Sequence, residues 1–235
     1  MRLGIFFLLI VSVCSAGLIF SRYLIGRANQ DWASLNRYHH DNQGLNPPGP
    51  RENRVVFFGD SITDTWAYYF DTMFPDKPYI GRGISGQTTP QMLVRFRQDV
   101  VALSPAVVVI LAGTNDIAGN TGPSTQGMIE DNLISMVEIA KANGIRIVLS
   151  SVLPVNDYPH KGGLEPGPKV VALNAWIKEY SAANDIVYLD YHSAMVDENL
   201  GLRQDLSADG LHPNTAGYWL MTPLVEASIS EAFGQ

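Results

Sequence analysis

Cysteine is almost absent from this sequence. Cys14 is the single cysteine among 235 residues, and it stands inside an apolar N-terminal run. One cysteine cannot form a disulfide within its own chain, so the fold has to be stabilised without such cross-links.

Positive charge is also scarce. Lys and Arg number 16 against 23 Asp and Glu, which gives a net charge of −7. The chain therefore lacks the basic patch that contacts to nucleic-acid phosphates require, and we expect no nucleic-acid partner. Repeats and low-complexity tracts are missing too. Hydrophobic residues at 46 % and charged residues at 17 % are ordinary for a folded globular protein. The length suits one large domain and is marginal for two.

The N-terminal residues differ from the rest. Residues 3–20 form an apolar run of a length between that of a signal-peptide core and that of a membrane-spanning helix. The stretch "CSA" (14–16) resembles a cleavage site, whereas the arginines beyond the run would suit an uncleaved anchor. Lipidation of Cys14 is a third alternative, although a bulky residue precedes it. We predict that residues 1–27 are a signal peptide or membrane anchor, the only route to membrane association, and that residues 28–235 form an extracytoplasmic domain.

Short apolar runs alternate with longer amphipathic stretches along the rest of the chain. The run at 106–112 contains no polar residue, which is typical of strands covered on both faces. Alternation of strands and helices predicts right-handed crossovers and a parallel sheet. We therefore predict one three-layer α/β domain with a central five-stranded parallel sheet. The expected strands are 54–58, 78–80, 106–112, 145–152 and 185–191, and the expected helices are 28–43, 88–103, 124–143, 168–183 and 214–232.

The stretch "GRGISG" (81–86) matches the dinucleotide-binding fingerprint G-x-G-x-x-G, which would indicate an oxidoreductase with a nicotinamide or flavin cofactor. That fingerprint follows the first strand of its fold and has an acidic residue about twenty positions further on. Here the stretch follows the second predicted strand, and the apolar "PAVVVI" stands at the later position. We therefore interpret the glycines as a backbone turn that lets an N–H group face a substrate, and we predict no cofactor.

Polar blocks follow the predicted strands where ligands bind in open parallel sheets, outside the carboxyl ends of the strands. "GDSI" follows the first strand, "GISGQT" the second, "GTND" the third and, after a loop, "DGLHP" the fifth. Each block alone has a structural explanation, such as a helix N-cap, an Asx turn or a local Asp–His pair. Four blocks that converge on one edge instead predict a functional site with a nucleophile, a glycine turn, an amide and an Asp–His pair.

These blocks, in this order, resemble those of the SGNH or GDSL hydrolases, and the chain looks most similar to the branch of platelet-activating-factor acetylhydrolase-like and bacterial acylhydrolases. The resemblance spans residues 54–217. It implies a flavodoxin-like three-layer fold and a carboxylic ester hydrolase, a GDSL-type serine esterase or lipase, without cofactor or metal. Ile62, Gly81 and Gln87 depart from the family's pattern. Those departures leave the substrate preference open, because none of them changes a catalytic atom.

The resemblance assigns Ser61 as nucleophile, His212 as general base and Asp209 as the carboxylate that orients the base. A serine hydroxyl is a poor nucleophile until a base removes its proton. His212 would accept that proton through one ring nitrogen while the other donates to Asp209, and the spacing in "DGLH" lets the carboxylate reach the imidazole of its own turn. The substrate would be a small ester with a short- to medium-chain acyl group, hydrolysed through an acyl-enzyme on Ser61.

Attack on the ester would create an oxyanion that needs preorganised donors. The backbone N–H groups of Ser61 and Gly86 and the side-chain amide of Asn115 would supply them. Glycine has no Cβ to block the oxygen, and an amide donates where a carboxylate does not. We expect Asp60 to support the turn around Ser61 and Asp116 to support the loop around Asn115.

Other polar and aromatic residues have structural interpretations. His39-His40-Asp41 are adjacent residues at a helix end, which do not converge easily on one metal ion, so we predict no metal site. His160 and His192 are expected to be solvated or structural. Trp66 and Trp219 are expected to pack in the core rather than stack on a substrate.

Other functions would suit the same residues. An acyltransferase or a carbohydrate O-acetylesterase could use the same site, and a flavodoxin-like binding module would show no turnover at all. The loop at 154–168 follows the fourth predicted strand, so it is expected beside the site. Its four prolines and three glycines make it a poor amphipathic lid, which favours an open cleft.

Overall fold

The computed structural model describes residues 31–159 and 161–234. The compact unit that carries the sheet spans Ala33–Gln235. The segment 1–27, predicted as a signal peptide or anchor, lies outside the described residues, so that prediction stays a prediction. Within the described part of the chain, no helix is both long enough and apolar enough to cross a membrane.

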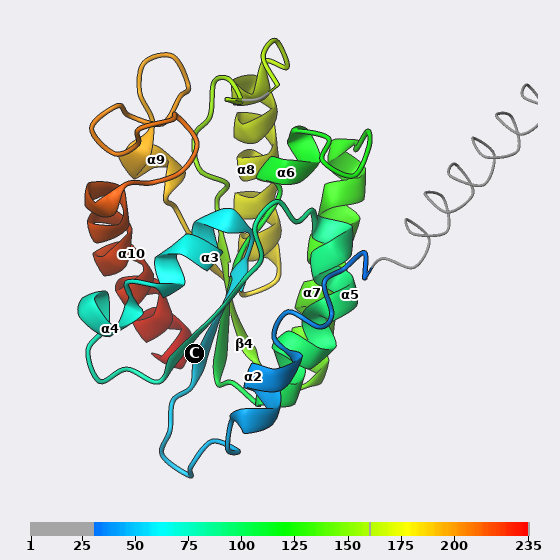
Figure 1. The fold of residues 1–235 in the computed structure, drawn as a ribbon, viewed down its shortest axis with the longest axis vertical. Coiled ribbons are helices and arrows are strands. Elements are labelled where there is room, and N and C mark those ends of the chain that lie inside the picture. The colour runs from blue at the N-terminus through cyan, green and yellow to red at the C-terminus, as the bar shows by residue number, and fades with distance from the viewer. Residues whose placement is uncertain (1–30, 160, 235) are drawn as a thin grey trace, which may run out of the picture. The chain divides into compact units, whose positions relative to one another are not determined.

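Five parallel strands form one sheet at the centre of the fold (Figure 1). Their spatial order is β2-β1-β3-β4-β5. The predicted five-stranded parallel sheet is confirmed. The strands are β1 (Val55–Gly59), β2 (Tyr79–Gly83), β3 (Val107–Leu111), β4 (Arg146–Ser150) and β5 (Val187–Leu189).

Helices cover both faces of the sheet, which explains why the central strands contain so few polar residues. Val56 and Phe58 face one core cluster, while Val55 and Phe57 face the other. Figure 1 shows α3, α4 and α10 on one side of the sheet and α5 and α7 on the other. The first group is α3 (Ser61–Ala67), α4 (Phe70–Met73) and α10 (Thr215–Gly234); the second is α5 (Thr89–Asp99), α7 (Gln126–Ala142) and α8 (Pro166–Ala183).

The predicted helix at 28–43 is largely wrong. In the described residues α2 covers only His39–Gly44, and turns precede it. Ser34 has a φ of 54°, a left-handed conformation that a right-handed helix cannot contain. The segment packs on the sheet through Tyr38 instead, which is buried and donates its hydroxyl to the carbonyl of Gly83.

The second strand extends through the first part of the glycine stretch, where the sequence predicted a turn. A Cβ at Gly81 would lie 2.5 Å from the Cβ of Ala67, and one at Gly83 would lie 2.0 Å from the backbone nitrogen of Asp64. Both glycines lie in β2, and the absence of a Cβ at these two positions allows α3 to approach the strand closely. Gly86 alone of the three has a positive φ, 78°, and forms the predicted turn.

The chain order around β1 places two loops beside a crevice. After β1 the chain crosses to β2 on one side, and it then returns to β3 on the other side of β1. The connections after β1 and β3 run to opposite sides of the sheet and leave a crevice at the carboxyl ends of these strands. Ligands of open α/β sheets bind in such crevices. Ser61 follows β1, and Asn115 follows β3 in the short helix α6 (Thr114–Ile117).

Candidate active site

Ser61 is the first residue of α3, directly after β1. The Oδ1 atom of Asp60 accepts a hydrogen bond of 3.0 Å from the backbone N–H of Ile62, which caps the helix. A Cβ at Gly59 would lie 2.1 Å from the Oγ1 of Thr63, so glycine is required for this tight strand-to-helix turn. The turn places the Ser61 hydroxyl at a helix N-terminus, beside the carboxyl ends of the strands.

His212 and Asp209 lie next to Ser61, although 151 positions separate His212 from it in the sequence. The Oγ atom of Ser61 is 3.0 Å from the Nε2 of His212, and the Nδ1 of His212 is 2.8 Å from the Oδ2 of Asp209. The other carboxylate oxygen accepts from the backbone N–H groups of Leu211 and His212. Partial burial raises the pKa of Asp209, but the bonds from His212 and Leu211 outweigh it and leave that pKa below its usual value.

Ser207 supports this loop, and the sequence did not reveal it. Its Oγ donates to the carbonyl oxygen of His212 at 2.7 Å and accepts from the N–H of Gly210 at 3.0 Å. Ser207 is buried and pairs with Pro213 in an antiparallel bridge, which closes the loop that carries Asp209. The serine two positions before Asp209 was the available signal, but serine is so common in turns that it predicts little.

Gly86 and Asn115 come from the second and third blocks and line the same cleft as Ser61. The Nδ2 atom of Asn115 donates to the Oδ2 of Asp60 at 3.2 Å and to the carbonyl oxygen of Gln87 at 3.1 Å. Asn115 thus connects the turn after β1 with the turn that contains Gly86. All seven residues predicted for the site therefore belong to one set of neighbouring loops.

The two carboxylates predicted as supports, Asp60 and Asp116, have different partners. Asp60 is fully buried, which raises its pKa to about 6, although the Ile62 N–H and His212 partly offset the effect. Asp116 accepts from the backbone N–H of Thr89 at 2.9 Å and from its hydroxyl at 2.6 Å. Burial raises the pKa of Asp116, and these bonds partly offset it. Asp116 therefore connects the loop of Asn115 to the first turn of α5.

Two further polar residues at the site, Asn120 and Lys161, were not predicted from the sequence. The Nδ2 atom of Asn120 is 2.7 Å from the Oδ1 of Asn115 and 3.2 Å from the carbonyl oxygen of Gly86. The Nζ atom of Lys161 is 3.2 Å from the Oδ1 of Asn120 and 2.9 Å from the carbonyl oxygen of Ala118. Lys161 lies 41 positions from Asn120, in a loop whose composition gives no hint of this contact.

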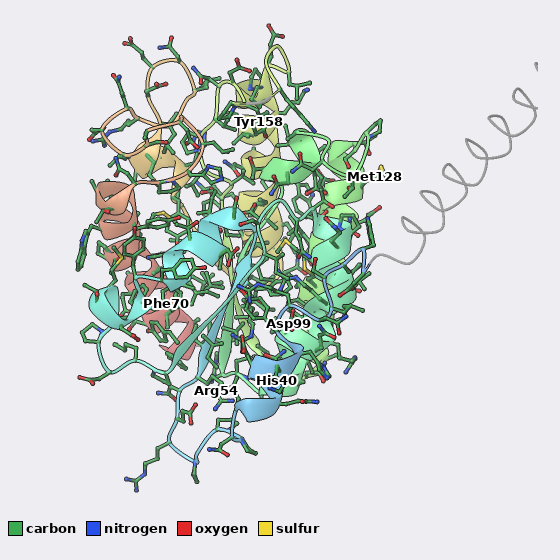
Figure 2. All side chains as sticks on the ribbon, viewed as in Figure 1. His40, Arg54, Phe70, Asp99, Met128 and Tyr158 are labelled. Atoms are coloured by element: carbon green, nitrogen blue, oxygen red, sulfur yellow. The ribbon has the colours of Figure 1, made fainter. Side chains whose placement is uncertain are left out.

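These residues surround an open cleft of about 470 Å³. Tyr158 comes from the loop at 154–168, which confirms that this loop lies beside the cleft, and its hydroxyl donates to the carbonyl of Thr114 at 2.8 Å. Figure 2 shows Tyr158 at the end of the molecule opposite to His40 and Arg54. The lining consists of Ser61, Thr65, Ser85, Gly86, Asn115, Ala118, Asn120, Tyr158, Pro159, Lys161, Leu211 and His212.

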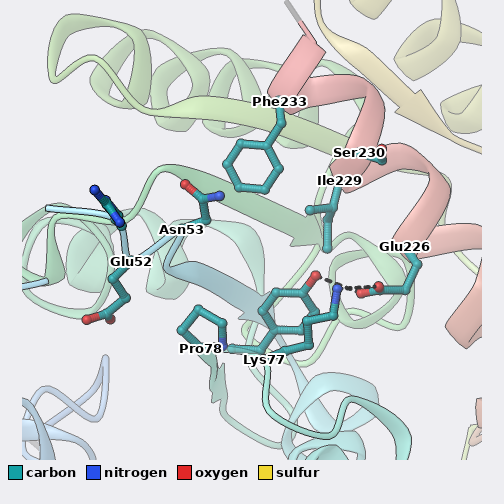
Figure 3. Close-up of a pocket in the computed structure, with 10 residues that line it drawn as sticks. Glu52, Asn53, Lys77, Pro78, Glu226, Ile229, Ser230 and Phe233 are labelled. Carbon is teal, nitrogen blue, oxygen red and sulfur yellow. Dashed lines mark hydrogen bonds and ion pairs between the residues drawn. The ribbon is translucent and has the colours of Figure 1, made fainter. Parts of the chain in front are cut away.

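A second pocket of about 460 Å³ lies at the amino ends of the strands, away from this cleft (Figure 3). In this pocket the Nζ of Lys77 is 3.1 Å from Glu226, and the hydroxyl of Tyr79 donates to the same carboxylate at 2.7 Å. The pocket holds none of the residues predicted for catalysis.

The other tryptophans and histidines that the sequence singled out lie in different environments. Trp66 is buried and stacks on Tyr218 with ring centroids 5.6 Å apart, so its prediction as a core residue is confirmed. Trp219 is 48 % exposed, and the same prediction is wrong for it, because it lies on the outer side of α10. Burial lowers the pKa of His192. His160 is outside the described residues, in which no group of three potential metal ligands occurs.

Comparison with known proteins gives consistent matches. Residues 57–220 match the model of the GDSL-like lipase/acylhydrolase family. A GDSL-like lipase from Bacteroides thetaiotaomicron VPI-5482 is 44 % identical, with a TM-score of 0.83 over 86 % of this chain and 100 % of that one. Esterase TesA of Pseudomonas aeruginosa is 28 % identical over 69 % of this chain and 80 % of its own. The lipoprotein YqeF of Bacillus subtilis is 34 % identical over 80 residues, about a third (32 %) of each chain.

The buried Asp60 predicts how stability depends on pH. Its pKa rises from an ordinary 3.8 to about 6, so between these values the folded protein holds a proton that the unfolded chain has released. The associated stabilisation is complete below pH 4 and is lost as the pH rises through 6. Asp60→Asn keeps the capping oxygen and removes the titration. Its amide nitrogen faces the Nδ2 of Asn115, which lowers the stability of the variant by an amount independent of pH, so the informative quantity is the pH dependence of the difference.

We therefore expect the free energy of unfolding of wild type, relative to Asp60→Asn, to fall by up to about 3 kcal/mol between pH 4 and pH 7. Urea unfolding of both proteins at intervals of one pH unit measures this difference. Parallel profiles for the two proteins would show that Asp60 does not titrate in this range.

Proposed function

The chain belongs to the GDSL-like lipase/acylhydrolase family and is a carboxylic ester hydrolase, and we propose that it acts as a serine esterase with Ser61 as nucleophile. One observation carries the proposal. The side chains of Ser61, His212 and Asp209 form a continuous line of contacts of 3.0 and 2.8 Å at the edge of the cleft. Hydrolysis by a serine nucleophile requires these three groups in this order: the nucleophile bonded to a base, and the base bonded to a carboxylate.

The proposed reaction has two halves. The Oγ of Ser61 bonds to the ester carbonyl carbon while its proton moves to the Nε2 of His212. The tetrahedral intermediate then expels the alcohol, which takes that proton, and an acyl-enzyme remains on Ser61. Water attacks the acyl-enzyme in the same way, with His212 again as base, and releases the carboxylic acid. Asp209 keeps the Nδ1 of His212 protonated and stabilises the imidazolium in both halves.

Three donors are proposed for the oxyanion of the intermediate. The N–H of Ser61 belongs to the first turn of α3, where the backbone N–H groups lack intrahelical acceptors. Gly86 lines the cleft in a positive-φ turn, and the nearest atom to a Cβ placed there would be 4.0 Å away. Asn115 would contribute Nδ2, whose two N–H groups donate at 3.2 Å to Asp60 and at 3.1 Å to the carbonyl of Gln87, so one of these bonds would be shared with the oxyanion during the reaction.

Asp60 and Asp116 act as supports in this proposal. The two oxygens of Asp60 bond to the Ile62 N–H and to Asn115, so one carboxylate orients both the nucleophile's turn and an oxyanion donor. Asp116 fixes the loop of Asn115 from the other side, through Thr89. Neither carboxylate touches the reacting atoms in this mechanism.

A location outside the cytoplasm is proposed on two grounds. The apolar segment at 3–20 has the composition of an export signal or anchor, and a matching relative, YqeF, is a lipoprotein. Residues 1–27 would then serve export or anchoring, and residues 28–235 would form the hydrolase domain. Membrane association would occur through residues 3–20 only.

The loop at 154–168 favours small acyl groups. Val155 is fully buried and Tyr158 is 6 % exposed, so the larger apolar side chains of this loop pack inward and are not free to cover a lipid chain. Ala118, Tyr158, Pro159 and Leu211 bring apolar side chains to the cleft, beside polar residues such as Ser61, Asn115 and Lys161. Each buried methylene of an acyl chain contributes about 0.8 kcal/mol to binding. The apolar surface of this cleft is short, so it can bury only the first few methylenes.

Replacement of the nucleophile tests the mechanism. We expect Ser61→Ala to lower kcat by up to roughly a million-fold on an activated ester such as p-nitrophenyl acetate, because the variant cannot form the acyl-enzyme. The thermal unfolding curve should match that of wild type. A variant that folds and retains a tenth of the wild-type rate would show that another group is the nucleophile.

Acyl-chain length tests the substrate class. Across p-nitrophenyl esters of increasing length, kcat/KM should peak between acetyl and about hexanoyl and fall beyond, because the cleft provides little further apolar surface. No activation is expected when the substrate forms an interface. Ser61→Ala measured on every ester corrects for background hydrolysis. Rates that still rise at dodecanoyl would indicate an apolar groove able to bind long chains.

A further inference from the structure

The orientation of the Asn115 amide decides what this side chain can contribute at the cleft. The oxygen and nitrogen of an amide have opposite hydrogen-bonding roles, and half a turn about the last side-chain bond exchanges them. An oxyanion is stabilised only if Nδ2 faces it. We propose that Asn120 is a positioning residue that fixes this orientation, and that Lys161 keeps Asn120 in place. This inference rests on the proposed function, in which Asn115 is an oxyanion donor.

Both sides of the Asn115 amide contact groups that distinguish oxygen from nitrogen. Its Nδ2 donates to the carbonyl oxygen of Gln87, which can only accept. Its Oδ1 accepts from the Nδ2 of Asn120 at 2.7 Å, the shortest contact that this amide makes in the described structure. A reversed amide would place oxygen against oxygen at Gln87 and nitrogen against nitrogen at Asn120. Asn120 therefore opposes the unproductive orientation directly.

The orientation of Asn120 is fixed in turn by groups with a single role. Its Nδ2 also donates to the carbonyl oxygen of Gly86 at 3.2 Å, and its Oδ1 accepts from the Nζ of Lys161 at 3.2 Å. A carbonyl cannot donate and an ammonium cannot accept, so only one orientation of the Asn120 amide satisfies both. The backbone N–H of Asn120 donates to the carbonyl of Asn115 at 3.0 Å, which holds the two residues at a constant separation.

Asn120 contacts two of the three proposed oxyanion donors. It bonds to the side chain of Asn115 and to the carbonyl oxygen of Gly86, whose own N–H is the second donor. Lys161 also donates to the carbonyl of Ala118 at 2.9 Å, which links the loop at 154–168 to the helix that carries Asn115. Loss of Asn120 should therefore disturb the donor geometry without removing a donor.

A double-mutant cycle tests the proposal in the full-length protein with p-nitrophenyl acetate. Asn115→Ala should lower kcat by about 100- to 1,000-fold, the effect of removing one oxyanion donor. Asn120→Ala should lower kcat by about 10- to 100-fold through misplacement of that donor, with KM within about threefold of wild type. Because Asn120 acts mainly through Asn115, and only secondarily through its bond to the Gly86 carbonyl, the loss in the double variant should fall well short of the product of the two single losses.

Two other substitutions separate orientation from a general structural role. Asn120→Asp keeps the shape but presents an oxygen to the Oδ1 of Asn115, so its kcat should be as low as that of Asn120→Ala. Lys161→Met should cause a smaller loss that disappears in the Asn120→Ala background. Asn143→Ala is the matched control, because this exposed-surface asparagine bonds only locally, to the carbonyl of Ile139 at 2.7 Å, and its kcat should be unchanged.

The outcomes are distinguishable from a failure of the proposed function. Losses that multiply in the Asn115 and Asn120 double variant, or wild-type kcat in Asn120→Asp, would overturn the positioning role. Should Asn120→Ala unfold, the cycle of Lys161→Met with Asn115→Ala decides, since it is predicted to be equally non-additive. Full activity of Ser61→Ala would overturn the esterase mechanism itself, and that variant leaves Asn120 and Lys161 unchanged.

Discussion

One buried guanidinium connects the parts of the molecule on which the site is built. Arg95 of α5 is fully buried and donates to the carbonyl of Gly59 at 2.9 Å, to the carbonyl of Arg82 at 3.0 Å and to the side chain of Gln87, and it forms an ion pair with the buried Asp99 at 3.1 Å. Burial lowers its pKa to about 10, partly offset by Asp99, so it remains charged at neutral pH. A buried charge costs several kcal/mol unless its hydrogen bonds are satisfied. Arg95 therefore restricts the ends of β1 and β2, and the turn after β2, to positions where its guanidinium keeps these hydrogen bonds.

The site geometry follows from that restriction. Gly59 directly precedes Asp60 and Ser61, and Gln87 directly follows Gly86, so Arg95 contacts both the turn that carries Ser61 and the turn that carries Gly86. The side chain of Asn115 then connects these two turns at the front, through Asp60 and Gln87. His212 and Asp209 lie on the loop before α10, a helix on the face of the sheet opposite to Arg95. Hydrogen bonds within that loop define the spacing of the two residues. Four loops thus meet within hydrogen-bonding distance around an open cleft.

The strands and the four polar blocks could be predicted from the sequence, because apolar runs and short motifs consist of consecutive residues. Prediction failed where the conformation or contact of a residue depends on an element distant in the sequence. Position 83 at the end of β2 requires glycine because the backbone of Asp64 in α3 leaves no room for a Cβ, which only the packed structure reveals. Lys161 and Asn120 carry no motif, and their contact spans 41 positions. The predicted helix at 28–43 failed for a local reason that residue type does not show, the left-handed backbone of Ser34.

Covalent labelling tests the central claim, that the hydroxyl of Ser61 is the activated nucleophile of this ester hydrolase. A fluorophosphonate transfers its phosphorus to an activated serine oxygen with loss of fluoride, and unactivated serines do not react at comparable rates. Incubation of the full-length protein should add one probe mass, peptide mapping should place it on Ser61, and Ser61→Ala should remain unlabelled. An adduct on a different residue, or ester hydrolysis that continues undiminished in fully labelled protein, would contradict the account.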